Sequence, residues 1–101
     1  MVFNYTDLEL TLTVDAEYLS RAEGVYVSVE TDAAALKLPV SSGDIDTETG
    51  EIRVILTQEM TGQLLGKALV QVNGFINGRR WASEQGTIMF RRNLLMEVIK
   101  P

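Results

Sequence analysis

The sequence predicts an all-β protein, most simply an antiparallel β-sandwich of immunoglobulin-like type with about seven strands. Three observations lead to this fold class. Short segments with alternating apolar and polar residues recur along the chain, turn-forming residues follow them about every ten residues, and no long segment has the period of an amphipathic helix. At 101 residues, the chain is expected to form a single domain over residues 1–101.

The first half of the chain holds three expected strands. Residues 7–15 and 25–30 alternate with Leu or Val at every second position, and a polar connection that ends in glycine, residues 17–24, joins them. Residues 35–40 alternate as well. Because Pro39 has no N–H to donate, we expect this third strand to lie at a sheet edge or to end there.

The acidic stretch GDIDTETGE, residues 43–51, has features of a calcium loop. Asp44, Asp46 and Glu48 have the one-three-five spacing of oxygen ligands, but the sixth position is not glycine and the twelfth is not glutamate. The composition favours a hairpin turn with Gly50 at a position of positive φ. We therefore expect a turn here, and no metal site.

The second half adds further elements in turn. Residues 51–57 alternate and predict a strand, and Thr57 is expected to cap a short helical turn near 58–65 that stops at Gly66. A last strand is expected over residues 86–92.

The dipeptide Asn77-Gly78 predicts a two-residue β-hairpin, because a type I′ turn needs positive φ at both central residues. This turn joins the strand 67–76 to its return strand and places Gly74 opposite Trp81. We expect the indole to pack over the glycine, an interpretation favoured over a role as a ligand platform. One face, expected in the core, then carries Val70, Val72, Gly74, Ile76 and Trp81.

The opposite face of this hairpin is the first candidate for partner contacts. It carries Gln71, Asn73, Phe75 and Arg80. One interpretation is a cation–π pair in which Arg80 shields an exposed phenylalanine ring. The other is a contact patch for a protein or a sugar.

The C-terminal stretch NLLMEVIKP, residues 93–101, is the second candidate. It is expected to be either a short helix capped by its asparagine or an extended tail. Such a terminus has more apolar surface than a free end should expose, so it either packs on its own domain or docks on a neighbouring subunit. The expected contact residues are Leu94, Leu95, Val98 and Ile99.

The composition excludes several function classes. The chain has no histidine and no cysteine, so Ser-His-Asp and Cys-His catalysis, disulfides and thiolate zinc sites are absent within one chain. A net charge of −5 argues against nucleic-acid binding. No apolar run approaches the roughly 18 residues of a membrane span. No catalytic, cofactor-binding or metal-binding residue is predicted.

Three stretches together carry a family resemblance: VILTQEMTG (54–62), GKALVQVN with NGRRWAS (66–83), and NLLMEVI (93–99). They resemble small immunoglobulin-like proteins from the structural gene clusters of tailed phages and prophages of Gram-positive bacteria. The layout is similar to that of the N-terminal domain of phage baseplate upper proteins. The resemblance implies a virion or tail-assembly component that resides in the bacterial cytoplasm during assembly and then in the virion.

These observations give two functional hypotheses. The first is a non-enzymatic structural module that contacts other virion or tail proteins, and further copies of itself, through a sheet edge or the C-terminal tail. The alternative is a small carbohydrate-binding module that uses the face around Phe75. No cofactor, nucleic acid or membrane partner is expected in either case.

Overall fold

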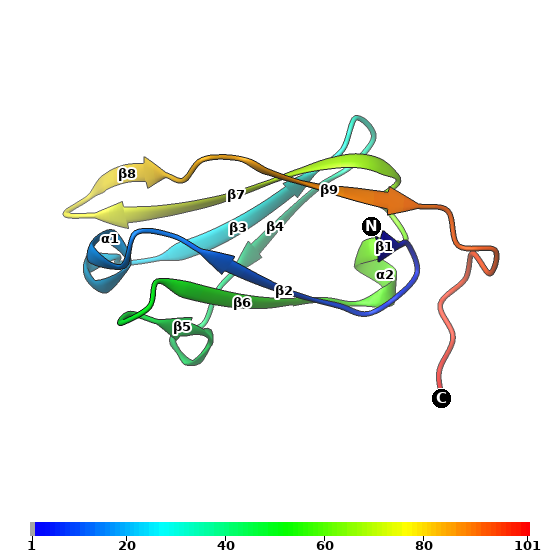
Figure 1. Cartoon of the computed structure of the whole chain (residues 1–101), viewed down its shortest axis with the longest axis horizontal. Helices are drawn as coiled ribbons and strands as arrows, with labels where there is room; N and C mark the ends of the chain where they lie inside the picture. The colour runs from blue at the N-terminus through cyan, green and yellow to red at the C-terminus, as the bar shows by residue number, and fades with distance from the viewer. Residues whose placement is uncertain (1) are drawn as a thin grey trace.

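A computed structural model describes residues 2–101 as two packed β-sheets, which confirms the all-β sandwich (Figure 1). The larger sheet holds, in order, β1 (Val2–Phe3), β9 (Gly86–Arg91), β7 (Gly66–Ile76), β3 (Val25–Glu30) and β4 (Ala35–Pro39), with β8 (Arg79–Ala82) also paired to β7. The smaller sheet holds β2 (Leu8–Thr13), β6 (Glu51–Leu56) and β5 (Ile45–Asp46). Since β1 and β5 have only two residues each, the seven longer strands match the expected number.

The chain crosses repeatedly between the two sheets, as in an immunoglobulin-like sandwich. It passes from β2 in the smaller sheet to β3 and β4 in the larger one, returns through β6, and ends in β7, β8 and β9. All pairs are antiparallel except β1 with β9, where Val2 lies opposite Phe90 and Phe3 opposite Arg91. The sequence did not predict β1, because two residues show no periodicity.

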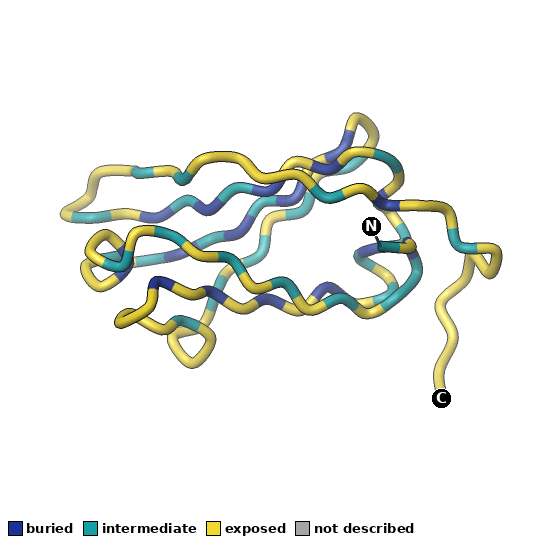
Figure 2. The backbone as a smooth tube through the Cα atoms, in the orientation of Figure 1, coloured by how far each residue is buried: buried dark blue, intermediate teal, exposed yellow. Residues whose placement is uncertain are grey.

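The core lies between the sheets, where the apolar faces of the alternating strands meet. Figure 2 shows buried residues alternating with half-buried or exposed ones along β3, β6 and β7. This pattern confirms the period-two assignments. The largest fully buried side chains include Phe90, Ile52, Leu56 and Leu64.

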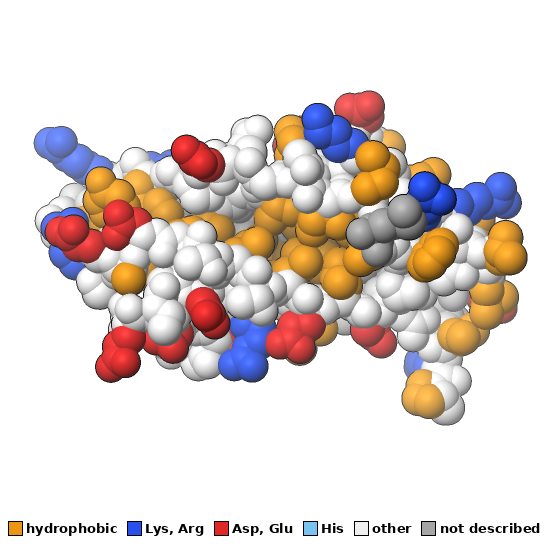
Figure 3. Space-filling view, in the orientation of Figure 1, with side chains coloured by type: hydrophobic (Ala, Val, Ile, Leu, Met, Phe, Trp, Pro, Cys, Tyr) orange, Lys and Arg blue, Asp and Glu red, His pale blue; other side chains and the backbone are white. Residues whose placement is uncertain are grey.

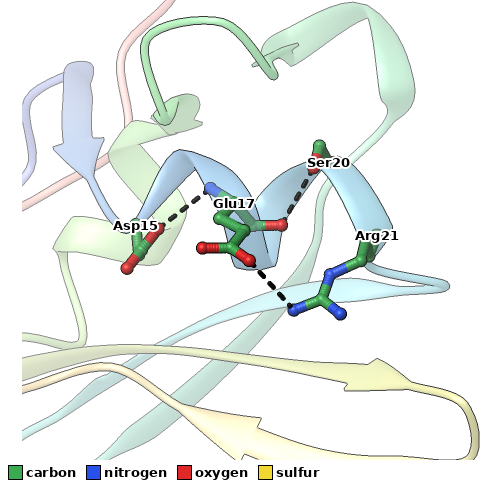
Figure 4. Close-up of polar contacts among 4 residues, drawn as sticks. All are labelled: Asp15, Glu17, Ser20 and Arg21. Carbon is green, nitrogen blue, oxygen red and sulfur yellow. Dashed lines mark hydrogen bonds and ion pairs between the residues drawn. The ribbon is translucent and has the colours of Figure 1, made fainter.

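The segment expected as a polar connection contains a helix, α1 (Ala16–Arg21), so that prediction was wrong. Asp15 caps the helix, since its side chain accepts the backbone N–H of Glu17 at 2.9 Å, and Arg21 pairs with Glu17 one turn later (Figure 4). Leu19 is the one buried residue of the helix, and it anchors the helix on the core. Because the surrounding residues are mostly polar, the segment shows no clear pattern of apolar residues at helical spacing, and its sequence did not indicate a helix.

The remaining turn and edge predictions are confirmed, apart from one helix end. Strand β4 is an edge, and the bond from Val40 N to Val25 O places the nitrogen of Pro39 on its unpaired side. Gly50 has φ +79° in the turn before β6. Thr57 caps α2 (Gln58–Thr61) by accepting from Met60 N, but Gly62 is the C-cap of this helix, so the expected stop at Gly66 is wrong.

Strands β8 and β9 are two parts of one return strand, separated by a β-bulge. Ala82 lies opposite Asn73 and Gly86 opposite Val70, so three residues of the return strand face two of β7. The extra residue reverses the alternation. As a result, Trp81 in β8 and Phe90 in β9 both face the core. In an uninterrupted strand, residues nine positions apart would face opposite sides.

The C-terminal segment is an irregular tail with bends at Leu94, Leu95 and Glu97, so the structure contradicts the helix alternative, and the tail is not extended throughout. Residues 92–101, all of which are described, form neither helix nor strand. Asn93 holds the start of the tail against buried Asn4: its N–H donates to Asn4 Oδ1 at 2.8 Å, and its Nδ2 donates to Asn4 O at 3.1 Å. Within residues 2–101, no helix is long and apolar enough to cross a membrane.

Candidate docking surfaces

The β7–β8 hairpin has the register that the Asn-Gly turn predicts. Gly74 lies opposite Trp81 and Phe75 opposite Arg80, and both turn residues have positive φ. A Cβ at Gly74 would lie 2.8 Å from two atoms of the Trp81 ring, so the indole packs directly on the glycine. On its other side, the indole stacks on Tyr18 of α1 with ring centroids 6.2 Å apart.

The outer face of the hairpin brings the four predicted residues together, but they are largely engaged with one another and with the backbone. Arg80 Nε donates to Asn73 Oδ1 at 3.1 Å, and Gln71 Nε2 donates to the carbonyl of Ser83 at 2.8 Å. The expected cation–π pair between Arg80 and Phe75 is therefore wrong. Within residues 2–101, a different pair forms the cation–π contact: Lys37 lies over the ring of nearby Tyr26.

Phe75 itself is 39% exposed and lies opposite Arg80, near the hairpin turn. Its replacement by alanine is expected to change the free energy of unfolding by less than about 1 kcal/mol, because the ring leaves no buried cavity behind. Urea unfolding followed by circular dichroism measures this change. A loss of several kcal/mol would mean that the ring supports the fold. Unchanged stability with loss of binding on a glycan array would assign the ring to a sugar site.

The tail presents the four predicted contact residues to solvent. Leu94 is 98% exposed, and Leu95, Val98 and Ile99 are each about half exposed. Figure 2 shows the tail as a continuous exposed segment that leaves the body of the domain. The tail therefore leaves Leu94 almost fully exposed and covers only about half of each other apolar side chain. Gln58 nevertheless holds its far end, with both amide atoms bonded to the backbone of Ile99 at 2.8 and 3.0 Å.

A third surface, which the sequence did not predict, is a groove between the two sheets that we call the open seam. Leu12–Asp15 form one side, Trp81–Gly86 form the other, and the nearly buried Val70 and Val72 lie at its base. The groove has a volume of about 660 Å³. Tyr18 and Trp81 close one end of it. No local pattern could indicate it, because it depends on which strand edges come together.

The acidic loop 43–51 contains the end of a 3-10 helix (Ser42–Asp44), strand β5 and the expected turn at 47–50. Asp46 Oδ1 accepts the backbone N–H groups of Glu48 and Thr49, so the carboxylate is used within the turn. In residues 2–101, no cluster of three or more acidic side chains is close enough to hold a metal ion.

Comparison with known proteins adds no relative to this picture. No protein-family model matches the chain, and no curated protein matches it significantly.

Proposed function

We propose that this protein is a non-enzymatic structural module that acts through protein–protein contacts made by its C-terminal tail. In keeping with the family resemblance of its sequence, we place it among the virion or tail-assembly proteins of a phage or prophage. Assembly would begin in the bacterial cytoplasm. The partners we propose are further copies of the chain and other virion proteins.

The observation that supports this proposal is the exposure of an apolar segment that is nevertheless held in place. Five apolar side chains project from a tail fixed near both ends, by Asn4 at its start and by Gln58 at Ile99. A partner that covers them gains apolar contact without first ordering a fully free segment. These side chains are Leu94, Leu95, Met96, Val98 and Ile99.

The test is the mass of the full chain in solution, measured by light scattering over a range of concentrations. We expect association in the native chain and a folded monomer when Leu94, Leu95, Val98 and Ile99 are all changed to serine. The matched control changes two exposed apolar residues outside the tail, Ile55→Ser and Leu65→Ser, and should still associate. A native chain that is monomeric at every concentration would contradict the proposal. Association that survives the four serines would contradict it as well.

A further inference from the structure

The sandwich is open along one side, where β2 faces β8 and β9. Within residues 2–101, β2 pairs with β6 alone, and β1 covers only Phe90 and Arg91 of β9. In a constant-type immunoglobulin sandwich, the first strand lies beside the second at this place. Figure 3 shows apolar side chains in a hollow between the two sheets on this side. The space of one strand is therefore left unfilled along the open seam.

The burial of the strands reflects this gap. In β6, the inward-facing residues Ile52, Val54 and Leu56 are buried. In neighbouring β2, the three inward-facing residues Leu8, Leu10 and Leu12 remain only half-buried, as does Val14 directly after the strand. Opposite β2, Trp81 of the open seam and Ile88 of β9 are also half-buried. One additional row of apolar side chains would complete the burial on both sides.

On the β2 side of the open seam, one row of backbone groups has no ladder partner within residues 2–101. Val14 N donates to Gly50 O at 2.9 Å. This bond shows which residues of β2 direct their backbone N–H and C=O groups towards β6, because these groups alternate in direction along a strand. The backbone groups of Leu8, Leu10 and Leu12 then face β6, and those of Glu9, Thr11 and Thr13 face the open side. Such an edge can pair with an additional strand.

We propose that the open seam binds the C-terminal tail, residues 93–101, of a second copy of this chain as an added β-strand. This inference rests on the proposed function, since it uses the same tail, and it names the surface that the tail occupies. Strand addition of this kind combines main-chain hydrogen bonds with the burial of alternate side chains.

The tail has the length and the pattern that the seam requires. Residues 94–99 equal the six residues of β2 in number. In an extended conformation, Leu94, Met96 and Val98 share one face, which is entirely apolar. The other face carries Leu95, Glu97 and Ile99, of which only Glu97 is charged. The apolar face would enter the seam, and the face with the glutamate would point to solvent.

The charges of tail and body are complementary. Residues 91–101 contain three basic residues and one acidic residue, whereas residues 1–90 contain six basic and thirteen acidic ones. Arg92 and Lys100, eight positions apart, flank the apolar segment. Asp7 and Asp15, also eight positions apart, flank β2. Opposite charges at both ends favour this pairing.

Trp81 supplies an independent indication of an absent partner. Its Nε1 is buried and donates to no acceptor within residues 2–101. Buried N–H groups in native proteins nearly always have a partner. Because Trp81 lines the seam, a carbonyl of an added strand at this end is a candidate acceptor.

The occupant comes from a second copy because each tail is held away from its own seam. The bonds from Asn93 to Asn4 and from Gln58 to Ile99 keep the tail at the end of the domain that carries α2. The C-terminus points away from the body in Figure 1. The bonds at Ile99 are exposed and can be exchanged for bonds to a neighbouring β2 at little cost.

The first test blocks the edge without touching the core. Thr11→Pro removes an N–H that faces the open side, so the β2–β6 ladder is preserved. Lys37→Pro is the matched control, because Lys37 holds the same position on the free edge of β4. Analytical ultracentrifugation of the full chains should show the dissociation constant rise at least about tenfold for Thr11→Pro and stay near the native value for Lys37→Pro.

The second test separates the two faces of the tail with equal changes in charge. Leu94→Asp with Val98→Asp places two charges on the face that enters the seam, and should abolish association. Leu95→Asp with Ile99→Asp places them on the outer face, and should weaken association far less. The Thr11→Pro chain can only donate its tail, and the Leu94→Asp/Val98→Asp chain can only accept one. A mixture of the two chains should therefore form a one-to-one complex.

The outcomes distinguish the two proposals. Association that depends on the tail but not on Thr11 would overturn the seam as the acceptor, while the tail would remain the docking element. Equal effects of the two aspartate pairs would also overturn it. Thermal unfolding by circular dichroism checks that each variant is folded. If Thr11→Pro is unfolded, Thr13→Pro repeats the test at the next outward-facing residue.

Discussion

Replacing Gly50 by alanine is expected to lower the free energy of unfolding by about 3 kcal/mol. Gly50 has φ +79°, a backbone conformation that costs a residue with a side chain free energy. A Cβ built on Gly50 would also overlap the carbonyl oxygen of Val14. To relieve this overlap, the end of β2 must move, which disturbs the bond from Val14 N to Gly50 O.

The control for this prediction lies in the same loop. A Cβ at Gly43 meets nothing within 4 Å, and this residue has no positive φ. Gly43→Ala should therefore change the stability by less than about 0.5 kcal/mol. Urea unfolding of both variants measures the difference. Equal stability of the two variants would show that the close approach of Gly50 to β2 does not hold the loop.

Replacing Phe90 by alanine is expected to lower the free energy of unfolding by about 3–5 kcal/mol, because the lost ring leaves a cavity in the core. Phe90 is only 1% exposed and is the largest fully buried side chain. It lies where β1, β9 and β7 meet, since its partners across the sheet are Val2 and Gly66. A domain of this size has a total stability of only about 5–15 kcal/mol, so the variant should be close to unfolding at room temperature.

Met89 provides the matched control for Phe90. It precedes Phe90 in the same strand, points to the opposite face and is 49% exposed. Met89→Ala should remain within about 1 kcal/mol of the native protein in thermal or urea unfolding. A similar loss in both variants would mean that β9 is placed with the wrong face towards the core.

The parts of the fold that the sequence predicted are those determined over short distances. The type I′ turn at Asn77-Gly78 determines the pairing of Gly74 with Trp81, because a two-residue loop leaves no freedom in register. In the same way, alternation predicted the inward faces of β2, β3 and β6. Pro39 correctly indicated a sheet edge, since its missing N–H concerns the strand itself.

The parts that could not be predicted depend on tertiary placement or on very short segments. Helix α1 shows only one buried residue, Leu19, so its pattern does not differ from that of a polar loop. Its one local signal was Asp15, a preferred helix N-cap. The bulge between Ala82 and Gly86 could not be predicted from alternation, because alternation within each strand does not show how the two strands are joined.

The candidate sites likewise divide into those with a local sequence signal and those formed only by tertiary structure. Sequence reasoning identified the exposed residues of the tail and of the Phe75 face, because an apolar residue at a polar position is a local signal. It missed the open seam, which forms where the edge of β2 meets the bulge of a return strand from the other end of the chain. It also missed Tyr18, which reaches Trp81 only because α1 turns towards the hairpin.

Hydrogen exchange at the free edge of β2 tests the docking of the tail most directly. We expect the amides of Glu9, Thr11 and Thr13 to exchange fast in dilute protein and to become protected as the concentration rises, because an added strand then accepts their hydrogen bonds. The amide of Lys37, on the free edge of β4, should exchange fast throughout. Protection of the β2 amides that does not depend on concentration would assign the seam to the tail of the same chain. Fast exchange of these amides in the associated protein would show that the tail docks elsewhere.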